Sequence, residues 1–340
     1  MQACNSTTGC STTTAMTIEE EMNPYLNASL VAIIAIPGFL FNLLSFFVFF
    51  THPAFRNSFG RLTTLNVAAN CFLLLFFVFW SIPLIFSSLD QKLHLLNERL
   101  GQLSLFFAEI TYNSGVVLSI NRLVAISLPV FYRKYFTMRI TYIIIGVILA
   151  LSFLYWLVYF IPGCSFYFDV DANVWMFSDT KCGILLGDVI DLKYNLGLLS
   201  ISIVCDFVTM LFFRGANMRM KKLVADEKKA RQRTRKEIIF FLQSFSQTCG
   251  YVLMFVSFHI ISASVQVKFH VFLSTTIAWA SAHAFGGFII AVFNKEIRLH
   301  LSGKGGRRSI DNGSQAIEGQ FLNPFRHRYI GFFALLLAVL

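Results

Sequence analysis

Long apolar runs separated by short polar segments dominate this chain. Seven runs are long enough to cross a bilayer, and they cover approximately residues 29–50, 62–86, 101–125, 140–162, 194–213, 238–263 and 270–293. Each can span roughly 30 Å of hydrocarbon as a helix. The runs are apolar on all sides and lack the polar stripe of a surface helix in a soluble protein. Because backbone groups in lipid must satisfy one another, the pattern predicts seven transmembrane helices and disfavours a soluble all-α protein.

The composition supports this interpretation. Hydrophobic residues make up 56% of the 340 residues, charged residues only 14%, and Phe occurs 39 times. The charged share is about half that of a soluble domain. A globular core of this size would leave much of this apolar surface exposed to water. We therefore predict an all-α membrane protein built as a seven-helix bundle.

Lys and Arg are distributed unevenly between the polar segments. With the N-terminus outside, five of the 28 Lys and Arg residues fall in outer segments and the remaining 23 face the cytoplasm. The five are Lys92, Arg99, Lys181, Lys193 and Lys268. This asymmetry follows the positive-inside rule, so we expect the N-terminus outside and the C-terminus in the cytoplasm. The net charge of +10 is then cytoplasmic and does not indicate nucleic-acid binding.

The polar segments define the domain organisation. We expect an extracellular segment over residues 1–28, a seven-span domain over 29–298 and a cytoplasmic tail over 299–340. Residues 1–28 lack a signal-peptide pattern, so the first run is expected to direct its own insertion. Residues 214–236 contain ten Lys and Arg residues, which suit membrane lipid headgroups and a docking intracellular protein. The last twelve residues are apolar but too short to span a bilayer.

The cysteines agree with this topology. Four of the seven fall outside, where disulfides persist. Cys164 and Cys182 flank the second outer loop, and we predict that they form a disulfide, with two free thiols as the alternative. Asn5 and Asn27 begin Asn-x-Ser/Thr sequons and are candidate glycosylation sites on the outer side. The other cysteines are Cys4 and Cys10, a second candidate pair on the outer side, and Cys71, Cys205 and Cys249, which lie inside runs.

Four ionisable side chains stand out within the runs, where charged groups are costly and often functional. They are Glu109, Asp206, His259 and His283. Glu109 lies about 20 Å along the helix from Arg122, near mid-membrane. It is a candidate for lining a ligand cavity, and a protonated carboxyl bonded to a neighbouring helix is the alternative. His283 is a candidate partner of Glu109. Asp206 is expected toward the cytoplasmic side and His259 near the outer mouth, where ordinary structural roles suffice.

No catalytic or metal-binding pattern emerges. A seven-span zinc hydrolase needs several His and an Asp on facing helices, and the chain has no His-Glu-x-x-His pair. A retinal pump needs a Lys within the seventh run, whereas Lys268 and Lys295 only bracket it. Paired broken helices of a transporter are not visible. We therefore expect no enzyme, no cofactor and no metal.

Several motifs resemble those of rhodopsin-like G-protein-coupled receptors. Their third helix ends in Asp-Arg-Tyr, followed by x-Ala-Ile-x-x-Pro. Residues 121–129 read NRLVAISLP, so Arg122 and Pro129 match in register while Asn121 replaces the Asp. Residues 38–42 (GFLFN) resemble the first-helix Asn motif. Residues 294–298 (NKEIR) resemble the start of a short amphipathic eighth helix.

Other positions depart from that pattern. The seventh-helix Asn-Pro-x-x-Tyr is replaced by GGFII at residues 286–290, and the sixth helix has Ser257 near its usual Pro. The third helix begins LGQ at residues 100–102, without the usual Cys. A bridge within the second outer loop is therefore expected to replace the usual bridge to the third helix.

Residues 101–136, the loop 164–182 and residues 283–298 together resemble the nematode chemoreceptors of serpentine receptor class X, over about residues 30–300. The resemblance implies a G-protein-coupled receptor in the plasma membrane of sensory neurons. Such a receptor binds a small or secreted molecule outside and activates a heterotrimeric G protein inside. A seven-span channel or transporter subunit without G-protein coupling is the alternative.

The resemblance also implies roles for residues at both ends of the bundle. Arg122 is expected to rest near the inner ends of the third and sixth helices and to contact the Gα subunit after the sixth helix moves outward. Because Asn121 is neutral, Glu237 is a candidate partner for Arg122, and snorkelling of Arg122 to headgroups is the alternative. The candidate switch and coupling residues are Asn121, Arg122, Pro129, Glu237 and Asn294.

The candidate ligand cavity lies in the outer half. Phe255 lies about five turns above Glu237 and is placed at the floor of this cavity, with ordinary packing as the alternative. The ligand-cavity candidates are thus Glu109, Phe255 and His283. Five aspartates expected on the outer surface favour cationic or neutral ligands: Asp169, Asp171, Asp179, Asp188 and Asp191.

Overall fold

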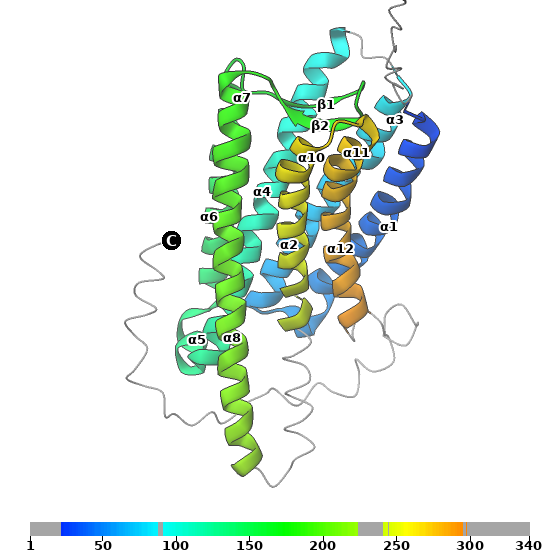
Figure 1. Ribbon diagram of the computed structural model, residues 1–340. Helices are drawn as coiled ribbons and strands as arrows, with labels where there is room; N and C mark the ends of the chain where they lie inside the picture. The colour runs from blue at the N-terminus through cyan, green and yellow to red at the C-terminus, as the bar shows by residue number, and fades with distance from the viewer. Residues whose placement is uncertain (1–21, 88–90, 224–240, 244, 295–296, 298–340) are drawn as a thin grey trace, which may run out of the picture.

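The computed structural model describes residues 22–87, 91–223, 241–243, 245–294 and 297, with only the backbone at residues 91–92 and 215–223. Seven helices in this part of the chain are long and apolar enough to cross a membrane. They lie together in one bundle (Figure 1). The predicted seven-helix bundle is confirmed, and a small two-stranded sheet, which the sequence analysis did not anticipate, lies at one end of it.

The first four spans alternate in direction through the bundle. The first is α1 (Pro24–Thr51), followed by the short turn η1 (Pro53–Phe55). The second consists of α2 (Ser58–Phe76), the π-helical segment η2 (Phe77–Ser81) and α3 (Ile82–Ile85). The third is α4 (Gln91–Ser127), with α5 (Pro129–Tyr135) after it, and the fourth is α6 (Met138–Val158).

The last three spans each contain a π-helical segment. The fifth comprises α7 (Lys181–Leu185), η3 (Leu186–Tyr194) and α8 (Asn195–Leu223). The sixth comprises helical residues 241–243 and 245–255, then η4 (Val256–Ile261) and α10 (Ser262–Ser264). The seventh comprises α11 (Lys268–Phe272), η5 (Leu273–Ile277) and α12 (Ala278–Phe293). Such segments are rare and often occur at functional sites.

Polar side chains at the helix starts satisfy exposed backbone N–H groups. The Asn23 side chain accepts hydrogen bonds from the N–H groups of Tyr25 and Leu26, and Pro24 occupies the first helical position. Asn57 accepts from the Gly60 N–H at the start of α2. These are the residue types that cap helices most effectively, so the local sequence fixes where the spans begin.

The two-stranded sheet is a hairpin between the fourth and fifth spans. Strands β1 (Phe166–Asp169) and β2 (Val174–Phe177) pair antiparallel, from Phe166 opposite Phe177 to Asp169 opposite Val174. Asn173 in the connecting turn has a φ of 57°, a conformation that Asn tolerates better than most residues. The hairpin lies across one end of the bundle, and α5 lies at the opposite end (Figure 1). We call these the hairpin end and the α5 end.

The third span is the most deeply buried of the seven spans. In its most apolar window 67% of the residues are buried, against 17% in α6. The exposed apolar residues of α6, such as Ile143 and Leu154, therefore suit contact with lipid. Because α4 packs against α2, α6, α8 and β1, a movement of this helix can be transmitted between the two ends of the bundle.

Two spans begin ten or more residues earlier than the hydropathy pattern predicts. We expected the third to start near residue 101, but α4 starts at Gln91. The fifth, expected near residue 194, is helical from Lys181. In both cases polar residues at the start suggested a loop, whereas they lie on helical turns that contact the hairpin or the bundle interior.

Candidate functional site

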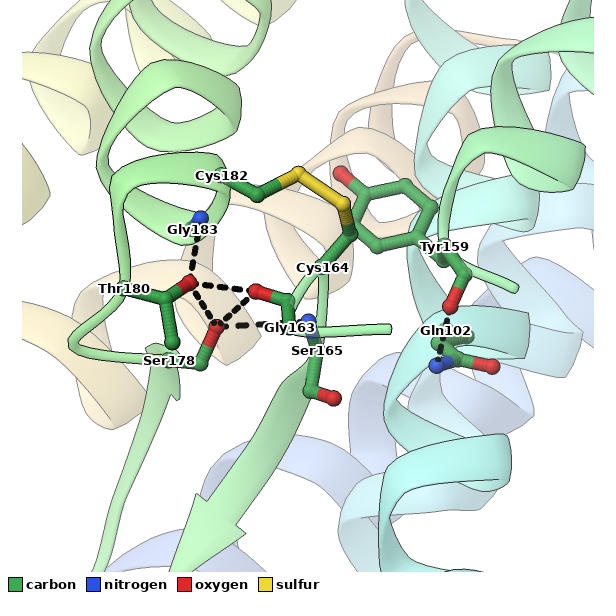
Figure 2. Close-up of a disulfide and its surroundings, with 9 residues drawn as sticks. All are labelled: Gln102, Tyr159, Gly163, Cys164, Ser165, Ser178, Thr180, Cys182 and Gly183. Carbon is green, nitrogen blue, oxygen red and sulfur yellow. Dashed lines mark hydrogen bonds between the residues drawn. A yellow bond between two sulfur atoms is a disulfide. The ribbon is translucent and has the colours of Figure 1, made fainter. Parts of the chain in front are cut away.

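A disulfide fixes the hairpin to the start of the fifth span. Cys164 and Cys182 are bonded, as predicted (Figure 2). Beside them, the Ser178 hydroxyl donates to the Gly163 carbonyl at 2.9 Å, and the Thr180 hydroxyl donates to the same oxygen. Thr180 also caps α7 by accepting from the Gly183 N–H at 3.0 Å. Both ends of the loop are therefore joined at one point.

Hydrogen bonds attach the hairpin to the first turns of the third span. The Asn97 side chain donates to the Phe168 carbonyl at 2.8 Å and accepts from the Phe168 N–H at 3.2 Å. The Trp80 indole donates to the same Asn97 oxygen at 2.9 Å. A Cβ at Gly101 would lie 2.1 Å from the Phe166 carbonyl, so glycine permits the close approach of β1. These contacts take the place of a covalent bridge to the third helix.

Aromatic rings seal the hairpin end. Trp175 of β2 is buried, stacks on Phe166 at 5.8 Å and meets Trp279 of α12 edge-on at 5.9 Å. Its indole N–H donates to the Ser81 hydroxyl at 3.1 Å, and Phe77 lies 5.3 Å from Trp279. Aromatic pairs in these geometries stabilise beyond their buried area. The hairpin thus covers this end of the bundle with packed aromatic side chains.

A small cavity lies beneath the hairpin. Its volume is about 10 Å³, and it is lined by Leu105, Tyr112, Phe166, Asp191, Met254, Phe255, Phe258 and Trp279. That is room for about one water molecule, so this cavity is too small to hold an organic ligand in this conformation. Phe255 lies in the cavity wall, with its ring centroid 5.3 Å from that of Tyr112.

Glu109 is buried between the third and fifth spans. Its carboxyl accepts from the Asn195 side-chain amide at 2.8 Å and from the Asn113 amide at 3.3 Å. His283 is not its partner, so the expected pairing of Glu109 with His283 is wrong. The two side chains face different neighbours because Glu109 points toward the fifth span.

His283 belongs to a separate polar network in the middle of the bundle. Its Nδ1 lies 2.7 Å from Asn70 Oδ1, which also accepts from the hydroxyls of Thr111 and Tyr251. Gln247 donates to Asn66 at 3.1 Å in the adjoining layer. This network connects the second, third, sixth and seventh spans.

Asp191 and His259 form a pair that the sequence analysis did not predict. His259 Nε2 lies 2.9 Å from Asp191 Oδ2, and Asp191 also lies 3.4 Å from the Asn195 amide nitrogen. Asp191 is only 8% exposed, so placing it on the outer surface was wrong. It lies in η3 and His259 in η4, and both π-helical segments direct these side chains into the bundle.

Close packing between the first and seventh spans explains the glycines at residues 38 and 287. Asn42 donates to the carbonyls of Gly38 at 2.9 Å and His283 at 3.2 Å. A Cβ at Gly287 would lie 2.5 Å from the Asn42 amide nitrogen, and one at Gly38 would lie 2.3 Å from the Ala284 Cβ. Gly287 thus makes room for the Asn42 side chain, and α12 runs on as a regular helix through this region.

At the α5 end, Arg122 of α4 pairs with Asp206 of α8. Arg122 Nη2 lies 3.8 Å from Asp206 Oδ1 and 3.4 Å from the Ser119 hydroxyl. The side chains of Arg122 and Asp206 are 12% and 1% exposed. A cavity of about 30 Å³ adjoins Arg122 and is lined by polar side chains that include Asn66, Gln243 and Gln247. The cavity has room for about two water molecules, so this end is less tightly filled.

The remaining switch candidates lie near this end or outside the described residues. Asn121 is buried next to Arg122. Leu128 has a non-helical backbone, and Pro129 begins α5, because a residue before proline is disfavoured in a helix. Asn294 caps α12 and is buried. Glu237 lies outside the described residues, as does the expected eighth helix except for Ile297, which packs with Phe49 and Ile290.

The two glycosylation candidates have different outcomes. Asn5 lies outside the described residues. Asn27 lies in the first turns of α1 with its side chain fully buried and its amide nitrogen 3.8 Å from the Met22 sulfur. A glycan on Asn27 would require that side chain to leave its packed position.

Sequence reasoning missed the roles of three residues, although each role carried a signal: Asp206 as the partner of Arg122, and Asn195 and Asn113 as partners of Glu109. Asp206 lies at the depth of Arg122, and a buried cation requires a nearby acid. Asn195 follows Asp191 by four residues, and Asn113 follows Glu109 by four, which places each pair on one helix face. The pair Asp191 and Asn195 was missed because residues 186–193 were expected to form a loop.

Comparisons with known proteins agree with this architecture. The profile of the family "Serpentine type 7TM GPCR chemoreceptor Srx" matches residues 32–294. Serpentine receptor class X 45 of Caenorhabditis elegans is 27% identical over 280 residues, covering 78% of this chain and 77% of that protein. The crystal structure of squid rhodopsin matches with a TM-score of 0.63 at 15% identity, covering 84% of this chain and 86% of that chain, which shows a shared fold. The chain belongs to the Srx family of serpentine seven-transmembrane chemoreceptors, and it is a receptor rather than an enzyme.

Proposed function

We propose that this receptor binds a small molecule within its hairpin end and activates a heterotrimeric G protein through its α5 end. The hairpin end then faces outward and the α5 end faces the cytoplasm, in the plasma membrane of sensory neurons. The observation that carries the proposal is the Arg122–Asp206 pair, a buried charge pair at the α5 end of the central helix. The positive-inside distribution of Lys and Arg supports the same orientation.

The pair suits a two-state switch. Arg122 and Asp206 come from different spans, and their charged atoms are 3.8 Å apart, near the limit of an ion pair. Removing one partner of a buried pair leaves an uncompensated charge. The state in which α4 and α8 are held together at this end therefore depends on both residues. A switch needs states that differ by only a few kcal/mol, and a pair whose charged atoms are this far apart meets that requirement.

Ligand binding is proposed to act through the central helix. Tyr112 lines both the cavity under the hairpin and the cavity beside Arg122. Expansion of the closed outer cavity would move Tyr112 and the polar layer of Gln247 and Tyr251 beneath it. Separation of α8 from α4 would then release Arg122 for contact with the Gα subunit.

The test is guanine nucleotide exchange in membranes that contain co-expressed Gα subunits, challenged with pooled odorants and nematode secretions. We expect the wild type to stimulate exchange and Arg122→Ala to abolish it at equal surface expression. Arg139→Ala, an exposed Arg at the start of α6, is the matched control and should retain exchange. Equal exchange in wild type and Arg122→Ala would contradict the proposed role of Arg122. Ion or solute permeation without exchange would favour the channel or transporter alternative.

A further inference from the structure

Two buried carboxyl groups meet on one amide in the hairpin half of the bundle. The Asn195 side-chain nitrogen lies 2.8 Å from Glu109 Oε1 and 3.4 Å from Asp191 Oδ1. Glu109 is 2% exposed, Asp191 8% and Asn195 0%. We call Glu109, Asp191 and Asn195 the carboxyl cluster. It lies between the third and fifth spans, beside the closed cavity that Asp191 lines.

The carboxyl cluster contains two acidic side chains, but among the described residues a side chain that can carry positive charge pairs with only one of them. His259 pairs with Asp191 at 2.9 Å. Among the described residues, the side-chain partners of Glu109 are the amides of Asn195 and Asn113, and neither carries a charge. An uncompensated carboxylate in a low-dielectric interior is strongly disfavoured. A cation or a proton must therefore accompany Glu109.

The cluster also contains an unused hydrogen-bond acceptor. Within the described part of the chain, Asn195 Oδ1 is buried and has no hydrogen-bond partner. The side-chain oxygen of Asn113 accepts a long hydrogen bond of 3.4 Å from the Tyr194 hydroxyl. Most buried polar atoms in folded proteins are bonded, so an orphaned amide oxygen beside two carboxyls indicates a site for a donor. An ammonium group supplies up to three N–H donors and one positive charge.

The neighbouring cavity favours an organic cation over a metal ion. Among the described residues, no three His, Cys, Asp or Glu side chains are arranged to hold a metal. The cavity wall next to Asp191 is aromatic, with Tyr112, Phe255 and Trp279. Aromatic faces attract ammonium groups and pack against a ligand ring.

We propose that the carboxyl cluster binds the ammonium group of a small amine, whose apolar part occupies the aromatic cavity as it opens. Glu109 provides the counter-charge, Asn195 Oδ1 accepts an N–H, and the Asp191–His259 pair closes the other side. The inference rests on the proposed receptor function, because it names the chemical class of ligand that the outer half takes.

Thermal unfolding of the purified receptor, followed by tryptophan fluorescence, tests this directly. The probes are 2-phenylethylamine and its neutral analogue 2-phenylethanol. Ligands that bind the folded state raise the unfolding midpoint with concentration. We expect the amine to raise the wild-type midpoint and the alcohol to leave it unchanged at the same concentration. Equal shifts with both probes, or no shift with the amine, would overturn the proposal.

Variants locate the site. In Glu109→Gln, which keeps the shape of the side chain and one of its two acceptor oxygens, we expect the apparent affinity for the amine to fall roughly tenfold or more. Asp191→Asn should also weaken it and serves as the second variant if Glu109→Gln does not fold. Asp188→Asn, an exposed acid in the same η3 segment, is the matched control and should bind as wild type. Undiminished amine binding in both Glu109→Gln and Asp191→Asn would overturn the assignment.

This readout does not involve a G protein. Amine binding without nucleotide exchange would contradict the proposed function and leave the amine site intact. Exchange stimulated by neutral molecules, with no amine binding, would support the receptor and overturn the amine site.

Discussion

The two ends of the bundle are held by different kinds of contact. At the hairpin end, the loop is fixed to three spans by a disulfide, by hydrogen bonds from Asn97 and by edge-on packing of Trp175 on Trp279. At the α5 end, α4 and α8 are joined by a charge pair at 3.8 Å, next to a cavity of about 30 Å³ whose lining is partly polar. The first end is built to hold one shape, and the second to change shape at low energetic cost. Substitutions at the hairpin end should therefore lower stability, and substitutions at the α5 end should alter signalling.

Breaking the disulfide should have the largest effect. Cys164→Ser removes a crosslink between residues 18 apart in sequence, which should lower the free energy of unfolding by about 3 kcal/mol. The measurement is the thermal unfolding midpoint of purified receptor in detergent. Cys249→Ser, which removes a half-buried free thiol, is the control and should cost less than about 1 kcal/mol. Equal midpoints for Cys164→Ser and wild type would show that the hairpin is held without the disulfide.

Removing the Asn97 side chain should have the next largest effect. Asn97→Ala leaves the Trp80 indole and the Phe168 backbone groups without their partners in a buried site. An unsatisfied buried polar group costs about 1–3 kcal/mol, so the unfolding midpoint should fall measurably, but less than in Cys164→Ser. Leu95→Ala, on an exposed position of the same helix, should leave the midpoint nearly unchanged. A midpoint for Asn97→Ala that matches Leu95→Ala would remove Asn97 from the anchor.

Neutralising Asp206 should have the smallest effect on stability and a clear effect on signalling. Asp206→Asn should weaken the hold on Arg122 by about 1 kcal/mol, because the charged atoms are 3.8 Å apart and the Asn side-chain oxygen can still accept a hydrogen bond from Arg122. Ligand-free nucleotide exchange should then rise several-fold, since about 1.4 kcal/mol corresponds to a factor of ten. Asp188→Asn is the control. Unchanged ligand-free exchange in Asp206→Asn would contradict a restraining role for Asp206.

The comparison of the two ends also shows what the sequence could predict. The seven spans followed from the length of the apolar runs, because lipid requires that pattern. The Cys164–Cys182 bridge followed from placing both residues in the same outer loop. The positions of Arg122 and Pro129 at the end of α4 followed from a local motif.

The interior contacts were harder to predict because they join residues far apart in sequence. Asn70 meets His283 and Asn97 meets Phe168, and neither contact has a local signal. Asp191 was assigned to the surface because charged residues near a span usually mark a loop. The π-helical segment η3 turns it inward instead, and backbone geometry of this kind is not visible in a hydropathy pattern.

The most direct test of the account is ligand-free nucleotide exchange, across a panel of Gα subunits, in wild type, Asp206→Asn, Arg122→Ala and the double variant. If Asp206 restrains Arg122, Asp206→Asn should raise exchange, and adding Arg122→Ala should remove that increase completely. Exchange in the double variant that equals exchange in Asp206→Asn would contradict the account, because it would show that the increase does not pass through Arg122.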